Sequence, residues 1–252
     1  MSKETEFYFN AVVGIFKKIK EQSGDSIDKA AELMSEAILN DKLIHIIGPG
    51  GHSNMAAMEL FWRAGGLAPI NAILDPGIAL INGARHSNIM ERTPGYAKSV
   101  LDSYDIKNGD VMIIVNAYGI NSMTIDSALE VKARGLKTIG VTSTSFAGHV
   151  PKDHPARHPS GKNLYEIVDV FVDNYLPLGD AIVKFDNFDQ KVAPTSTLFN
   201  SFALNLMVIK TVEKILKKGG IPPVWVSANM PGGDKSNKQL EEKYSSRIKH
   251  LI

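Results

Sequence analysis

The chain has 252 residues, of which 44% are apolar and 22% charged, and a chain of this length buries roughly three-quarters of its unfolded surface without disulfides. Its 28 basic and 27 acidic residues nearly balance, which argues against a protein that coats nucleic acid or an anionic membrane, and the absence of cysteine excludes disulfides, thiolate metal sites and thiol nucleophiles. No segment reaches the roughly 18 uninterrupted apolar residues of a membrane span, and the charged amino terminus lacks a signal pattern, so we expect a cytoplasmic protein.

The amino-terminal segment is predicted to form a pair of helices. Apolar residues recur at helical spacing over 7–19 and again over 27–38, and Ser23-Gly24 separates the two patterns. We expect one domain over 1–252, with three parts: a helical extension (1–40), an α/β core (41–220) and a C-terminal tail (221–252).

Within the core, short β-prone runs alternate with helical patterns. The expected strands are 43–47, 68–74, 111–115, 137–141 and 168–172. A helix is predicted over 54–64, and residues 75–105 are predicted as loop and helix. Pro194-Thr195-Ser196-Thr197 is predicted to cap a long helix that runs to Lys218. This alternation predicts an open parallel sheet with right-handed crossovers and helices on both faces.

Small polar residues gather where the predicted strands end and the next helices begin. In open parallel sheets ligands bind at this edge, and hydroxyl and amide side chains beside free helix N–H groups suit an anion or a polyol. The ligand-binding residues predicted here are Gly50, Gly51, His52, Ser53, Asn116, Tyr118, Gly119, Asn121, Ser122, Thr142, Ser143, Thr195, Ser196 and Thr197.

The first of these loops leaves two alternatives open. Gly48-Pro-Gly-Gly-His-Ser53 is similar to a dinucleotide fingerprint, but Ser53 stands where the third glycine belongs. Asp75 lies 27 residues after Gly48, rather than the usual spacing of about 20. An NAD(P)-dependent oxidoreductase is therefore a lesser alternative, and no cofactor is expected. Ser53 could also simply cap the next helix.

The loop 149–162 holds three of the seven histidines, and its prolines exclude a helix. We interpret it as a basic lid that helps to hold a phosphate, with Lys162 as a binding residue. A zinc site and an inert surface loop are the alternatives, and no metal is expected. Ser160-Gly161-Lys162 is not a phosphate-binding loop of the Walker type, because the upstream glycine and the following Ser or Thr are missing.

Acid–base candidates are few. Glu59 follows His52 by seven residues on a predicted helix, so it could act as a base next to a carbonyl group. A structural salt bridge to Arg63 is equally compatible with its position. His86 could act as a general acid or could be a surface histidine.

Several segments together resemble the SIS (sugar isomerase) domain, and within it a branch of uncharacterised phosphosugar-binding proteins. The segments are 50–53, 61–69, 121–135, 158–162, 172–180, 194–197 and 222–234. The resemblance implies a flavodoxin-like three-layer fold, a homodimer or higher homo-oligomer, and a phosphorylated sugar in the cleft. It assigns Ser53 to the sugar and the second loop to the phosphate. Members include aldose–ketose isomerases and non-catalytic sensor domains, so both functions are expected alternatives.

The sequence departs from the family at two places. The family's second loop has a run of Ser and Thr, whereas this chain has Asn116, Ala117 and Tyr118 before Gly119. The acid–base pair of phosphoheptose isomerases is also not visible, because Arg63 stands near the place of the first acid. The remaining catalytic candidates are Glu59, His86 and His158.

Overall fold

The structure is a computed structural model, and it describes residues 2–251. Its centre is a five-stranded sheet in the order β2-β1-β3-β4-β5, with every neighbouring pair parallel. The strands are β1 (Ile44–Ile47), β2 (Ile70–Ile73), β3 (Val111–Val115), β4 (Lys137–Thr142) and β5 (Val170–Asp173). The predicted open parallel sheet is confirmed, and its strand order is that of flavodoxin-like folds.

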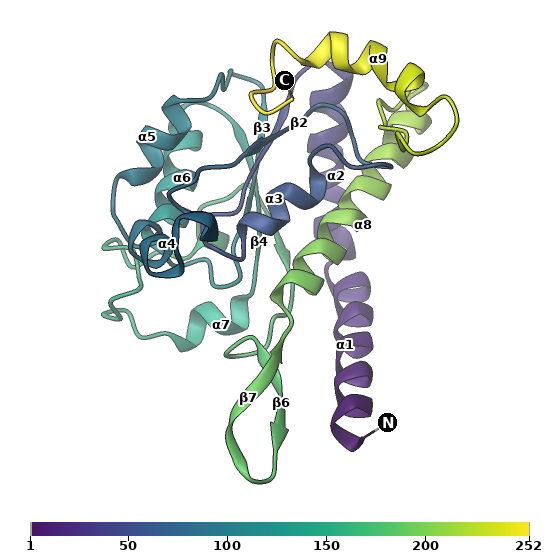
Figure 1. The fold of residues 1–252 in the computed structure, drawn as a ribbon. Coiled ribbons are helices and arrows are strands. Elements are labelled where there is room, and N and C mark those ends of the chain that lie inside the picture. Colours follow the sequence, from purple (N-terminus) through teal and green to yellow (C-terminus); the bar gives the residue numbers. More distant parts are fainter. Residues whose placement is uncertain (1, 252) are drawn as a thin grey trace.

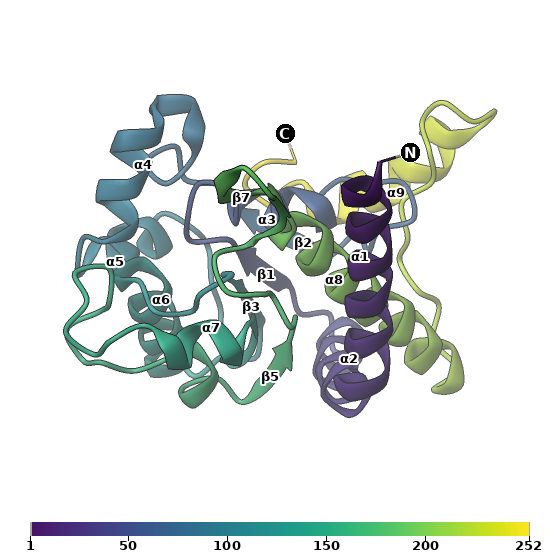
Figure 2. The same cartoon turned by 90° about the horizontal axis from the view of Figure 1, so that it is seen from below.

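Helices cover both faces of the sheet, as Figure 2 shows. One face carries α1 (Lys3–Gln22), α2 (Gly24–Leu39), α3 (Asn54–Leu60) and α8 (Ser196–Lys217), and the other carries α4 (Ala84–Glu91), α5 (Tyr96–Asp102) and α6 (Ser122–Ala133). Successive strand residues point to opposite faces. Ile46 therefore packs with Phe199 in one apolar cluster, while Ile47 packs with Ile125 in the other. The two predicted amino-terminal helices are confirmed as α1 and α2.

Two elements were not predicted. An antiparallel hairpin, β6 (Ala181–Phe185) and β7 (Phe188–Pro194), precedes α8 and projects from the body beside the first turns of α1 (Figure 1). A short helix, α7 (Thr144–His149), follows β4. Short 3-10 helices lie at Leu80–Asn82 and Leu164–Glu166.

The helix expected over 54–64 ends early. Its last residue is Leu60, because Trp62 adopts a left-handed backbone conformation with φ 48° that no α-helix accommodates. The chain then turns to pair with the tail, where the N–H of Gly65 donates to the carbonyl of Trp225 at 2.8 Å. The early end of α3 thus follows from the docking of the tail.

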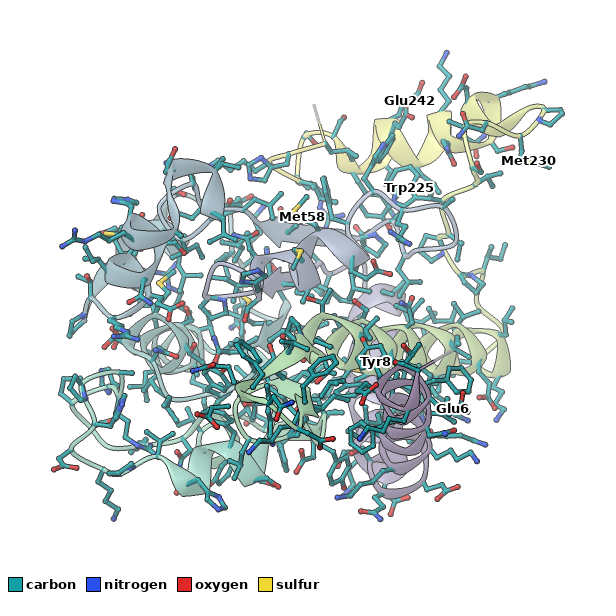
Figure 3. All side chains as sticks on the ribbon, turned by 60° about the horizontal axis from the view of Figure 1, so that its bottom comes forward. Glu6, Tyr8, Met58, Trp225, Met230 and Glu242 are labelled. Carbon is teal, nitrogen blue, oxygen red and sulfur yellow. The ribbon has the colours of Figure 1, made fainter. Side chains whose placement is uncertain are left out.

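The tail returns to the body and ends in α9 (Gly233–Tyr244). Trp225, Tyr244 and Ile248 form a small apolar cluster with residues next to β1 and β2. In Figure 3 Trp225 lies between Met58 of α3 and Met230 of the tail. Within residues 2–251, no helix combines the length and the apolar character needed to cross a membrane.

Candidate functional site

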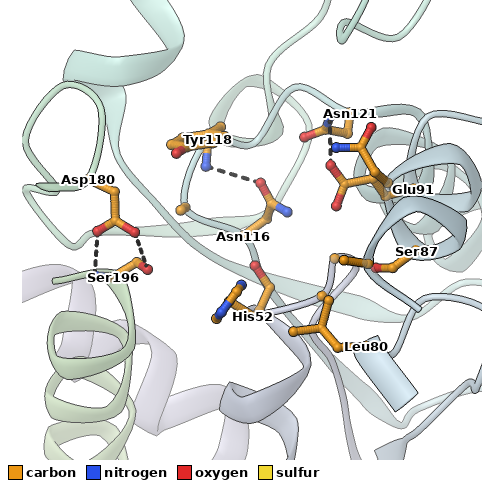
Figure 4. A pocket seen from close by; sticks show the side chains of 15 residues that line it. His52, Leu80, Ser87, Glu91, Asn116, Tyr118, Asn121, Asp180 and Ser196 are labelled. Carbon is orange, nitrogen blue, oxygen red and sulfur yellow. Dashed lines mark hydrogen bonds between the residues drawn. The ribbon is translucent and has the colours of Figure 1, made fainter. Parts of the chain in front are cut away.

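A cavity of about 310 Å³ opens at the carboxyl ends of β1 and β3 (Figure 4). The connections from these neighbouring strands leave toward opposite faces of the sheet, which is where open α/β sheets place their ligands. The cavity is lined by Gly50, Gly51, His52, Ser53, Leu80, Ala84, Ser87, Asn88, Glu91, Asn116, Ala117, Tyr118, Asn121, Asp180 and Ser196. The structure thus brings together eight of the residues predicted from the loops: Gly50, Gly51, His52, Ser53, Asn116, Tyr118, Asn121 and Ser196.

The first loop turns tightly between β1 and α3. A Cβ on Gly48 would lie 1.8 Å from the carbonyl oxygen of Ser53, so only glycine fits there. Ser53 occupies the cap position of α3, but its side chain makes no capping hydrogen bond. The capping alternative for its hydroxyl is therefore wrong. Within the described chain, the backbone N–H groups of residues 51–53 also have no acceptor.

Asn116 holds the second loop against the first. Its Oδ1 accepts hydrogen bonds from the N–H groups of Tyr118 at 3.0 Å and Gly119 at 2.8 Å, and its Nδ2 donates to the carbonyl of Pro49 at 3.0 Å. Only 4% of Asn116 is exposed. A buried amide with all these bonds satisfied is a positioning residue, because its polar atoms are already committed.

Tyr118 forms one wall of the cavity. Its ring stacks on Phe146 with centroids 3.8 Å apart and planes at 20°. Burial raises the pKa of the Tyr118 hydroxyl, and the charges of Asp180 and Glu91 raise it further. Both carboxylates therefore act electrostatically on the same part of the cavity.

Asp180 occupies the start of α8. Its carboxylate accepts hydrogen bonds from the N–H groups of Thr195 and Ser196, each at 2.7 Å, and from the Ser196 hydroxyl at 2.8 Å. A carboxylate at a helix N-terminus is stabilised by these N–H groups and by the helix dipole. The predicted cradle at 195–197 is thus already filled by a group of the chain itself, as Figure 4 shows for Asp180 and Ser196.

Glu91 is the last residue of α4 and faces the cavity from the side opposite Asp180 (Figure 4). Burial raises the pKa of its carboxyl group to about 6, although the charge of Arg92 opposes this rise. Its nearest polar contact is Nδ2 of Asn121, at 3.5 Å, which also donates to the carbonyl of Ala156 at 3.2 Å. Within residues 2–251, Glu91 forms no ion pair.

Sequence reasoning missed nearly half of the cavity lining. The missed lining residues are Leu80, Ala84, Ser87, Asn88, Glu91, Ala117 and Asp180. The first five lie in the segment 75–105, which carries no motif, and Asp180 lies at the start of the unpredicted hairpin. The one usable signal was the position of this segment directly after a predicted strand end.

The other predicted ligand-binding residues lie outside the cavity lining. Gly119 and Ser122 are buried within the second loop. Thr142 and Ser143 are buried at the end of β4, where the Ser143 hydroxyl donates to the carbonyl of Leu176 at 2.8 Å. Thr195 is also fully buried, while Thr197 and Lys162 are exposed elsewhere.

None of the three predicted catalytic residues lines the cavity. Glu59 pairs with Arg63 at 3.2 Å, so the salt bridge expected as the alternative is confirmed. His86 is exposed on α4. His158 contacts Asp126 at 3.0 Å through Nε2 and the hydroxyl of Ser160 at 2.7 Å through Nδ1.

The cavity is polar but holds no fixed positive charge. Among its lining residues, all within the described chain, are Glu91 and Asp180 but no Lys or Arg, and His52 is the one side chain that can become cationic. Residues 2–251 contain no group of three or more His, Asp or Glu side chains arranged to hold a metal ion.

Comparison with known proteins places the chain in a family. The SIS domain matches residues 7–143. A UPF0309 protein of Geobacillus thermodenitrificans is 38% identical over 245 residues, which cover 97% of this chain and 96% of the relative. A UPF0309 protein of Caldanaerobacter subterraneus is 36% identical over 249 residues, which cover 98% of this chain and 99% of the relative.

Solved structures share the fold at much lower identity. Phosphoheptose isomerases from Neisseria gonorrhoeae and Francisella tularensis each cover 84% of this chain at 17% identity, with TM-scores of 0.51 and 0.53. The match covers 97% of the first isomerase and 99% of the second. With the resemblance seen in the sequence, the strand order and these relatives all in agreement, the chain belongs to the SIS domain family and is a relative of the UPF0309 proteins.

Proposed function

We propose that the chain binds a phosphorylated sugar in the cavity between the first and second loops. The observation that carries this proposal is the uncommitted polar surface of the first loop: the Ser53 hydroxyl and the N–H groups of residues 51–53 have no partner in the described chain. Such donors, free and fixed in a turn, suit the oxygens of a phosphate or of a sugar.

The rest of the cavity supports a ligand that is rich in hydroxyl groups. Asn88 and Asn121 supply amides, and Tyr118 supplies both a hydroxyl and a ring face. A few polar groups that converge on a preformed cavity are typical of sites for small polar molecules. The names of the solved phosphoheptose isomerases with this fold point to the same ligand class.

Calorimetric titration of the full chain tests the proposal. We expect glucose 6-phosphate or sedoheptulose 7-phosphate to bind, and unphosphorylated glucose to bind far more weakly. Ser53→Ala should weaken binding about tenfold, because one hydrogen bond to a charged ligand is lost. Ser145→Ala, which removes an exposed hydroxyl from α7 outside the cavity, is the matched control and should bind like the wild type.

Two outcomes would contradict this proposal. One is the absence of heat with every sugar phosphate tried, and the other is equal affinity for the wild type and Ser53→Ala. The panel also includes NAD and NADP, because binding of a dinucleotide without any sugar phosphate would favour the oxidoreductase alternative.

A second candidate function is aldose–ketose isomerisation, which Glu91 favours. The reaction needs a base that removes a proton from the carbon next to the carbonyl and returns it to the neighbouring carbon, so that an enediolate forms in between. A carboxylate whose pKa is raised to about 6 is well matched to this transfer near neutral pH. Unlike Glu59, His86 and His158, Glu91 lines the cavity.

Proton exchange separates an enzyme from a sensor. In deuterated water, the wild type should incorporate deuterium into a bound sugar phosphate, as followed by nuclear magnetic resonance. Glu91→Gln should slow this exchange about 100-fold or more, while Glu242→Gln on the distant tail should not. Loss of exchange in Glu59→Gln instead would reassign the base, and a wild type that binds but never exchanges would be a sensor.

A further inference from the structure

The charge balance of the cavity is unusual for a site that takes a phosphorylated ligand. A phosphate monoester carries up to two negative charges near neutral pH, and the cavity adds the carboxylates of Glu91 and Asp180. Among the lining residues of the described chain there is no Lys or Arg to offset them. Like charges in a partly buried site repel strongly, because the local dielectric constant is lower than that of water.

The two carboxylates differ in how their charge is already compensated. The Asp180 carboxylate accepts four hydrogen bonds, from the N–H group and the hydroxyl of both Thr195 and Ser196, and it lies at the positive end of α8. Glu91 has one amide contact, at 3.5 Å to Asn121, and no ion pair in residues 2–251. The uncompensated charge of the cavity is therefore that of Glu91.

Glu91 also lies directly against the loop that supplies the free N–H groups. Its Oε2 is 2.7 Å from the point that a Cβ on Gly50 would occupy. Beside it, Oδ1 of Asn121 accepts no hydrogen bond within the described chain. One side of the cavity thus offers donors for an anion, and the adjoining side offers two uncommitted oxygen acceptors.

We infer that the ligand is a phosphorylated sugar that carries an ammonium group, which pairs with Glu91 and donates to Oδ1 of Asn121. This inference rests on the proposed binding of a phosphorylated sugar, and it replaces the role of Glu91 as a base, because a carboxylate paired with an ammonium group is held in its ionised form. An ammonium group lowers the net charge of the ligand and gives the buried carboxylate the partner that it lacks. A metal ion would fit less well, because residues 2–251 provide no cluster of three acidic or histidine ligands.

Calorimetric titration of the full chain with three probes tests the inference. Glucosamine 6-phosphate carries the ammonium group, whereas glucose 6-phosphate and N-acetylglucosamine 6-phosphate carry a neutral group at the same carbon. We expect the wild type to bind the amine about tenfold more tightly than either neutral probe. In Glu91→Gln this preference should fall to about twofold or less, while affinity for glucose 6-phosphate stays equal or rises because repulsion is removed. Glu242→Gln should keep the full preference.

The outcomes separate this inference from the proposed function. If the amine and the neutral probes bind the wild type equally well, the ammonium pairing is wrong and phosphosugar binding stands. If Glu91→Gln keeps the full preference for the amine, the pairing is also wrong. If none of the three probes binds but sedoheptulose 7-phosphate does, the ammonium pairing is wrong and phosphosugar binding stands. If sedoheptulose 7-phosphate does not bind either, both proposals fail. Glucosamine without phosphate serves as the control for the phosphate and should bind weakly.

Discussion

At the scale of single residues, the polar side chains of the cavity wall fall into two groups. Some are fully hydrogen-bonded within the chain, and others have almost no partner there. The polar atoms of Asn116 and Asp180 form hydrogen bonds that hold the two loops and the start of α8 in place. Ser53 and Glu91 make almost no such contacts, and yet both lie in the cavity. Because polar groups away from water are normally satisfied by the protein, groups left without partners mark the places where a ligand completes the structure.

The ionised carboxylate of Glu91 should therefore lower the free energy of unfolding when no ligand is bound. Its pKa is raised from 4.5 to about 6 on folding, so the folded state binds more protons between these values and stability falls as the pH rises through them. Above about pH 6 the cost is at most about 2 kcal/mol. We predict that Glu91→Gln is more stable than the wild type at pH 7.5, and that the difference shrinks toward zero near pH 4.

Chemical denaturation of both proteins across this pH range measures the difference directly. Glu242→Gln, in an exposed position of α9, should follow the wild type at every pH. A Glu91→Gln variant that is less stable than the wild type at pH 7.5 would mean that the carboxylate has a stabilising partner. That result would also weaken its assignment as the partner of a ligand.

At the scale of elements, the hairpin stands apart from the central sheet, because β6 and β7 pair only with each other among the described strands. An isolated two-stranded hairpin is marginally stable in water, and this one leaves 43% of Phe185 and 49% of Phe188 exposed. On α1 beside it, 53% of Phe7 is exposed, although the sequence pattern placed this residue on the apolar stripe. Neighbouring exposed aromatic side chains are typical of surfaces that pack against another protein.

We predict that this surface joins copies of the chain, in line with the homo-oligomer expected from the family resemblance. Light scattering coupled to size-exclusion chromatography should give at least twice the chain mass of 27.5 kDa. The double variant Phe185→Ser/Phe188→Ser should shift toward the monomer with little change in far-ultraviolet circular dichroism. A wild type that stays monomeric at micromolar concentrations would contradict the prediction.

At the scale of the whole molecule, the sequence was most informative where local pattern and burial coincide. The apolar run Val111–Val115 was expected to form a strand of a sheet with helices on both faces, and all its residues are buried in β3. The glycine-rich turn after β1 predicted a ligand-binding edge, and the cavity opens there. Because parallel strands end at one edge, two loops far apart in sequence could be expected to meet.

The parts of the fold and of the site that the sequence did not predict depend on tertiary packing, which local sequence patterns do not indicate. Glu91 and Asp180 reach the cavity only because α4 folds over the first loop and the hairpin leads into α8. Trp62 ends α3 early because the tail docks against the segment that follows it. Thr195 and Thr197 were predicted together from their place at a helix start, but Asp180 fills that place and Thr197 faces solvent.

The cavity wall includes two loops at the sheet edge and a separate segment, and this arrangement determines how its ligand selectivity can change. The two loops at the sheet edge are bound to each other through Asn116, so substitutions there disturb the scaffold. The stretch from Leu80 to Glu91 contributes several lining side chains and forms part of no strand of the sheet. Substitutions in this short stretch can change which ligand binds, while the sheet and its two loops keep their structure. Divergence among relatives, and any engineering of selectivity, should therefore concentrate there.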